Sequence, residues 1–238
     1  MINVTIWNEY KHEREKEAAK KIYPNGMHTV IADFLKENNF SVKTATFYED
    51  DCGLTDEVLQ STDVLIWWGH ALHREVPDEV AKRVQLAVLN GMGAVFLHSS
   101  HESKPFQLLL GTKCELSWCE NGDSERIWKC NPSHPIAQNI EGDFFTVDND
   151  ETYCEPFGIP EPDELVFIGS YTGGEAIRSG CCYKRGYGKI FYFQPGHETY
   201  PVFYNKNVQQ VIINAVNWAY SDYRRSTIVS KHILKTEK

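Results

Sequence analysis

The chain has 238 residues, of which 42% are hydrophobic, and its formal net charge is -9. This length suits one large α/β domain, and the apolar share excludes an intrinsically disordered chain. The acidic balance and the lack of a basic stripe argue against nucleic acid as a partner. No stretch approaches the roughly 18 apolar residues of a membrane span, so a membrane is not expected as a partner either. Small molecules are therefore the expected partners.

The start of the chain and its cysteines indicate the compartment. Residues 1–7 have the pattern of a strand and lack the charged start and long apolar region of a signal peptide. Seven cysteines without a secretion signal are typical of reduced thiols. We therefore expect a cytoplasmic protein.

The first half of the chain alternates predicted strands and helices. Strands are expected at residues 2–7, 41–47, 63–68 and 93–97. Helices are expected around residues 30–35, from 77 to 90 and from 105 to 110. The strand at 63–68 is apolar throughout, which is typical of a strand buried on both faces of a parallel sheet. These β-then-α units predict an α/β fold with a three-layer, doubly wound, mostly parallel sheet.

The pattern changes in the second half. Residues from about 112 to 185 form short alternating stretches with many prolines, glycines and aspartates, which indicate a β-rich insertion that caps the sheet. A buried strand at 189–193 and an amphipathic helix at 208–219 return to the α/β pattern. We expect a single domain over residues 1–220 and a frayed tail over residues 221–238.

Histidines gather where ligands bind in such folds. In open α/β sheets the site lies outside the carboxyl ends of the strands, where loops are free of core constraints. Three loops, at 67–73, 98–103 and 194–200, follow buried strands and hold five of the nine histidines: His70, His73, His98, His101 and His197. We expect these loops to form one polar pocket.

Some of these histidines are the expected ligands of a divalent metal. His70, His101 and His197 come from three different loops and can surround an ion from separate sides. Neutral imidazole suits zinc, and a mixed histidine and carboxylate set with an open position is typical of catalytic zinc. Glu198, Glu102 or an acid from the insertion is the expected oxygen ligand. The residues also leave open a metal-free pocket in which the imidazoles act as acid–base groups.

The loop after residue 97 holds further candidate catalytic residues. A tight strand-to-helix turn exposes a side chain beside free helix N–H groups, so Ser99 or Ser100 can act there as a nucleophile. The flanking glycines of a strict nucleophile elbow are absent, which weighs against that role. His98 in this loop and Glu198 after the late strand are the expected acid–base residues.

Two polar segments can contact a substrate or can be purely structural. Ser103 and Lys104 begin a predicted helix, where they can hold an anionic or hydroxyl-rich ligand, or Ser103 can simply cap the helix. Arg178 is a candidate substrate-binding residue, and its alternative role is a structural salt bridge with Glu175.

Residues 148–155 of the insertion place several acids and an aromatic residue close together. They can form a solvated loop, or a flap over the pocket. In the flap, Glu151 and Glu155 accept hydroxyl groups or bind the metal, and Tyr153 offers a stacking face.

At these motifs the chain resembles the trehalose-utilisation protein family, ThuA, over residues 1 to about 220. The segments that carry the resemblance are 67–70, 97–106, 134–136, 151–157, 173–175, 178–180 and 195–201. The resemblance implies a fold similar to the class I glutamine amidotransferase domain, which is related to flavodoxin-like sheets. It also implies a role in disaccharide metabolism.

The sequence departs from the amidotransferases at two places. Ser99 and Ser100 stand where those enzymes have a Gly-x-Cys-x-Gly elbow, and His197 is directly followed by Glu198 instead of forming a His-x-Glu pair. The resemblance therefore does not imply glutamine hydrolysis.

The leading interpretation is an enzyme that acts on a trehalose-like disaccharide or keto-sugar and holds a divalent metal, with zinc as the expected ion. The first alternative is a non-catalytic sugar-binding or regulatory module that uses the same pocket. The second is a serine or amidotransferase-like hydrolase. The aromatic-rich composition is compatible with a homo-oligomer.

Overall fold

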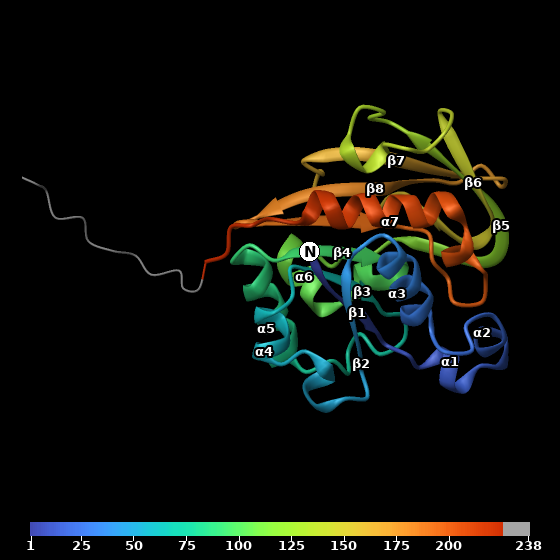
Figure 1. Ribbon diagram of the computed structural model, residues 1–238. Helices are drawn as coiled ribbons and strands as arrows, with labels where there is room; N and C mark the ends of the chain where they lie inside the picture. Colours follow the sequence, from blue (N-terminus) through green and yellow to red (C-terminus); the bar gives the residue numbers. More distant parts are fainter. Residues whose placement is uncertain (226–238) are drawn as a thin grey trace, which may run out of the picture.

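Five parallel strands form the core of the computed structural model, which describes residues 1–225 (Figure 1). These strands are β1 (Asn3–Asn8), β2 (Ser41–Thr46), β3 (Val64–Trp68), β4 (Gly93–Leu97) and β9 (Gly188–Phe193). Their order in the sheet is β2-β1-β3-β4-β9, and each neighbouring pair is parallel. This is the strand order of flavodoxin-like folds, and it confirms the predicted doubly wound sheet.

Helices cover both faces of the parallel strands, because successive side chains point to opposite sides of a buried strand. On β3, Ile66 packs in a core with α3 (Met27–Glu37) and α7 (Lys206–Ala219). Its neighbour Leu65 packs on the other face with α5 (Asp78–Leu89) and α6 (Lys104–Leu110). The short helix α4 (Asp56–Gln60) lies on this second side as well. The apolar strands thus bury both of their faces.

The second half of the chain extends the sheet sideways. Its strands are β5 (Ser117–Lys129), β6 (Phe144–Cys154), β7 (Glu164–Tyr171) and β8 (Ala176–Arg185). Strand β8 pairs antiparallel with β9, and the order continues as β8-β7-β5-β6, so all nine strands form one sheet. The segment predicted as a cap is therefore β-rich but belongs to the central sheet.

Strand β5 nevertheless reaches back toward the parallel strands. Its pairing with β6 shifts register between Cys119 and Glu125, and such bulges bend a strand. Figure 1 shows β5 strongly curved, on the same side of the molecule as α1 (His12–Glu15) and α2 (Glu17–Ile22). These two short helices were not predicted. The bend brings the first part of β5 and the last part of β6 close to the loops that carry the histidines.

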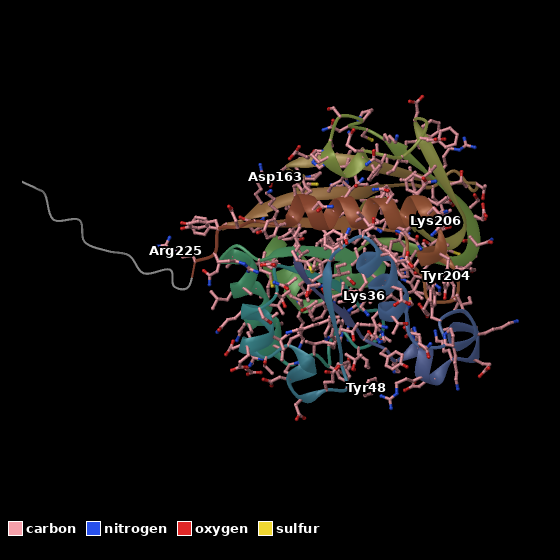
Figure 2. All side chains as sticks on the ribbon, in the orientation of Figure 1. Lys36, Tyr48, Asp163, Tyr204, Lys206 and Arg225 are labelled. Atoms are coloured by element: carbon pink, nitrogen blue, oxygen red, sulfur yellow. The ribbon has the colours of Figure 1, made fainter. Side chains whose placement is uncertain are left out.

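Short 3-10 turns complete the connections at Asp50–Gly53, His98–Glu102, Pro135–Ala137 and Val202–Tyr204. In Figure 2, Tyr48, which follows β2, and Asp163, which precedes β7, lie on opposite sides of the molecule, as expected for the two arms of a long sheet. Among the described residues, no helix is long and apolar enough to cross a membrane. Most of the predicted tail, from residue 226 on, lies outside the described residues.

Candidate functional site

The site begins with a buried carboxylate that holds the loop after β3. Glu9 follows β1 directly and accepts hydrogen bonds from the backbone N–H groups of His70, Ala71 and Leu72, at 2.7 to 3.0 Å. Glu9 is almost fully buried. Since buried backbone donors need partners, this single side chain fixes the loop on which His70 stands.

His98 occupies the sharp turn after β4. Its φ of 54° lies in the left-handed region, which histidine enters more easily than most residues. The turn aims its ring into the site, where Nδ1 lies 2.9 Å from the carbonyl oxygen of Gln194 and Nε2 lies 3.1 Å from Oε2 of Glu151. Burial alone would lower the pKa of His98, but Glu151 and Asp150 outweigh it and raise this pKa. The two carboxylates therefore favour the protonated form of the ring.

The two serines after His98 have structural contacts. The Ser99 hydroxyl donates to the carbonyl oxygen of Gly69 at 2.8 Å, and the Ser100 hydroxyl donates to that of Trp67 at 3.0 Å. Both bonds tie the loop after β4 to the end of β3. Within residues 1–225 neither hydroxyl is hydrogen-bonded to a histidine or a carboxylate, so the structure gives no support to Ser99 as an activated nucleophile.

Glu198 is the centre of a buried charge cluster. Its oxygens lie 2.5 Å from Nδ1 of His12, 2.9 Å from Nδ1 of His70 and 3.3 Å from Nζ of Lys16. Burial would raise the pKa of Glu198, but the hydrogen bonds from His12 and His70 hold it well below its usual range. Glu198 is therefore ionised at neutral pH, and it orients the His70 ring.

His197 is positioned by a second buried carboxylate. Asp150 accepts hydrogen bonds from the backbone N–H groups of Gly196, His197 and Glu151, at 2.9 to 3.0 Å. The His197 Nδ1 atom lies 2.8 Å from the Thr199 hydroxyl. Burial and the neighbouring His98 lower the pKa of His197 to about 3, so its ring is neutral at physiological pH.

The structure brings together two of the three histidines predicted as metal ligands. One ligand atom each from His70, His197 and Glu151 lies within 4.8 Å of the others. His12, His70 and Glu198 form a second group by the same measure, so that His70 belongs to both. The predicted flap residue Glu151 thus lies at the centre of the site and not over it.

His101, the third predicted ligand, is in neither group. Its Nδ1 atom lies 2.7 Å from the carbonyl oxygen of Cys114, and its ring packs edge-on against Tyr153 and Phe157. Burial lowers its pKa to about 4. His73 is also buried, and burial lowers its pKa to about 3. Both rings are neutral, and His101 is held by the core behind the site.

Ser103 and Lys104 do not reach the histidine cluster. Ser103 precedes α6 but makes no capping hydrogen bond, and its buried hydroxyl has no hydrogen-bond partner among the described residues. The Lys104 ammonium lies 2.7 Å from the carbonyl oxygen of Val76 and 2.6 Å from Oδ1 of Asp78. Lys104 thus ties the start of α6 to the start of α5, and its predicted role in ligand binding has no geometric support.

Glu155 and Arg178 bind each other. The guanidinium donates to both carboxylate oxygens, at 2.8 and 3.0 Å, and also to the carbonyl oxygen of Phe157. This pair fastens the end of β6 to β8, and Glu155 takes the place of the expected partner Glu175. Tyr153 is buried and stacks on His98, with ring centroids 4.9 Å apart, so it packs against that ring instead of facing solvent.

Several residues of the site were not predicted. Glu9, His12 and Lys16 belong to the long polar segment after β1, and the strand-end rule applied to β1 could have found them. Asp150 and Glu120 lie within strands, where only the register reveals which face they share. Glu120 approaches His197, with 3.8 Å between Oε1 and Nε2.

Comparisons with known proteins agree with this architecture. The family model described as ThuA, trehalose utilisation, matches residues 3–219. None of the proteins with curated descriptions matches the sequence.

Solved structures show the same fold at low sequence identity. A ThuA-like protein from Parabacteroides merdae superposes with a TM-score of 0.71 and 13% identity, covering 96% of this chain and 92% of the other. A ThuA-like protein from Bacteroides uniformis gives a TM-score of 0.68 and 16% identity, covering 93% and 92%. A glutamine amidotransferase from Thermotoga maritima gives 0.53 and 13%, covering 83% and 76%. These similarities confirm the amidotransferase-like fold, and the family match over nearly the whole length shows that the chain belongs to the ThuA (trehalose utilisation) family.

Proposed function

We propose that this protein is a metal-dependent enzyme of sugar catabolism that binds a divalent ion, zinc, through His70, His197 and Glu151. The observation that carries the proposal is the convergence of one ligand atom from each residue within 4.8 Å. Two imidazoles and one carboxylate are a donor set typical of catalytic zinc. In this set Glu151 replaces the expected His101.

The contacts around the three residues fit this role. The Nδ1 atom of His70 is taken by Glu198, and that of His197 contacts the hydroxyl and the backbone N–H of Thr199, so the Nε2 atom of each ring is the one that would bind a metal. Histidine ligands in metal sites commonly have their other nitrogen held in this way. The neutral state of His197 also suits coordination, because a protonated ring cannot bind a metal.

The second group, formed by His12, His70 and Glu198, is a poorer metal site. The Glu198 carboxylate already has His12 at 2.5 Å and His70 at 2.9 Å. The Lys16 ammonium lies 3.3 Å from the same carboxylate and would repel a second cation. We therefore assign this group to the orientation of His70.

The remaining residues supply proton transfer and substrate contacts. When bound, a divalent metal polarises a carbonyl group or activates water. His98 lies 3.1 Å from Oε2 of Glu151 and is the acid–base residue, while Tyr153 keeps its ring in place by stacking. Glu198 acts through His70 and is therefore a positioning residue. A trehalose-like disaccharide or keto-sugar is the substrate class, an assignment supported by the family description.

Elemental analysis of protein purified without chelators tests this proposal. We expect one zinc ion per chain in the native protein and a higher melting temperature when zinc is restored to stripped protein. His70→Ala and His197→Ala should lose the metal. His134→Gln should keep it, because His134 is a buried histidine outside both groups. Native protein without stoichiometric metal, and with a melting temperature that zinc does not change, would contradict the proposal.

A further inference from the structure

Trp118 is unusually exposed for its size. Its side chain is 66% accessible, and within residues 1–225 the terminal Met1 is the only large apolar residue that is more exposed. An indole is a broad apolar surface with one polar N–H group, and it is most often at least partly covered in folded proteins. Single exposed apolar side chains are common on protein surfaces, so the indole is a candidate ligand contact only where it lies on the side of a polar site.

The register of β5 and β6 places Trp118 on the face that carries the site. Trp118 lies directly opposite Tyr153, and residues opposite each other in an antiparallel pair project to the same face. Tyr153 stacks on His98, so this face is the one turned toward the histidines. Trp118 therefore projects from the face of the β5–β6 pair that is turned toward the site.

A distance further along the strand supports the same assignment. Glu120 lies two residues after Trp118, where the regular pairing of β5 with β6 ends. The Glu120 carboxylate lies 3.8 Å from Nε2 of His197. Trp118 thus lies about 7 Å farther along the strand than a residue that reaches the site.

The edge of the site that Glu120 approaches is polar and partly exposed. The side chains of Glu120, Lys16 and His70 are 49%, 47% and 23% exposed, whereas the groups behind them are buried. An exposed aromatic ring on the strand that carries Glu120, together with the carboxylate, ammonium and imidazole groups of the site, matches the chemistry of a pyranose. Such a sugar has an apolar C–H face to stack on the ring and hydroxyl groups for the polar partners.

We propose that Trp118 is the stacking platform for the outer ring of a disaccharide whose inner ring lies at His70, His197 and Glu151. This subsite rests on the function proposed above. It makes the site selective for two linked rings over one, because a single ring at the centre does not reach the indole.

Isothermal titration calorimetry with trehalose and with glucose tests this subsite, using native, Trp118→Ala, Trp118→Tyr and Trp128→Ala proteins. Trp128 is the matched control, since it is partly exposed on the same strand but lies at its other end. Trp118→Ala should weaken trehalose binding about tenfold and leave glucose binding unchanged. Trp118→Tyr should restore most of the loss, and Trp128→Ala should bind both sugars as the native protein does.

The subsite is overturned if Trp118→Ala binds trehalose as tightly as native protein, if Trp128→Ala weakens it equally, or if native protein binds neither sugar. Zinc content is measured on every sample. Failure of the metal proposal appears as native protein that lacks zinc, and a selective effect of Trp118→Ala on trehalose would then still support the stacking platform.

Discussion

The parallel and antiparallel halves of the sheet supply the site in different ways. The parallel strands β1, β3, β4 and β9 end at one edge, and each is followed at once by a loop that carries a site residue. The antiparallel strands β5 and β6 instead contribute Glu120, Asp150 and Glu151 from within the strands. The parallel half thus provides mainly imidazoles, and the antiparallel half provides carboxylates. The imidazoles and carboxylates of the two halves meet at the end of the sheet toward which β5 bends.

Both halves use the same device to fix a histidine loop. Glu9 accepts three backbone N–H groups of the loop after β3, and Asp150 accepts those of Gly196 and His197 together with that of Glu151. The Asp150 contact crosses between the halves, whereas the Glu9 contact stays within the parallel half. Mutations of these carboxylates therefore test whether contacts between the two halves contribute to the stability of the fold.

Replacement of Asp150 should have the largest effect. Asp150→Ala leaves three backbone donors without their partner in a buried position, so the free energy of unfolding should fall by about 3 kcal/mol. Chemical denaturation measures this loss. Asp148→Ala, an exposed aspartate on the same strand, should change stability by less than about 0.5 kcal/mol. Equal, small effects of the two substitutions would show that the halves are not joined through Asp150.

Glu9→Gln should have a smaller effect. The amide keeps one oxygen acceptor but loses the charge that strengthens three hydrogen bonds, and we expect a loss of about 2 kcal/mol. The exposed Glu15 provides the control as Glu15→Gln. Zinc binding by Glu9→Gln should weaken as well, because His70 stands on the released loop. A variant with native stability and native zinc affinity would contradict this role of Glu9.

The Glu155–Arg178 pair should have the smallest effect, because it is partly exposed. Burial would raise the pKa of Glu155, but the bonds from Arg178 and from backbone N–H groups lower it. The folded-state pKa is therefore below the unfolded value of about 4.3, so the pair stabilises the fold above that pH and loses its effect as pH falls through the folded pKa. Native protein should exceed Glu155→Gln in stability by up to about 1 kcal/mol at pH 7.

Chemical denaturation of both proteins, from pH 7 to pH values below about 4.3, checks the direction of this pH dependence. The stability difference between them should shrink as the pH falls below 4.3, and a difference that grows toward acid would refute the assignment. Arg178→Gln should resemble Glu155→Gln at pH 7. Metal content should be native in both, since neither residue belongs to the metal groups.

The sequence predicted the parallel half well because its signals are local. Apolar runs such as 63–68 and 93–97 mark buried strands, and the histidines that follow them lie at the expected edge. The resemblance to ThuA proteins pointed to the same fold, and the family match confirms it.

The antiparallel half could not be predicted to the same depth. Nothing local shows that β8 pairs with β9, that β5 bends at its bulges, or that Glu151 faces His98. For the same reason, His101 was expected beside His70 and His197, although its ring is held by the carbonyl of Cys114. These positions depend on the pairing register between strands that are distant in the sequence, and local sequence patterns do not reveal that register.

The proposed metal would join the two halves of the sheet, and anomalous scattering at the zinc edge from zinc-loaded crystals tests this most directly. We expect a single strong peak bound by Nε2 of His70, Nε2 of His197 and the carboxylate of Glu151. A peak at His12 and Glu198, a peak ligated by His101, or no peak at all would contradict it.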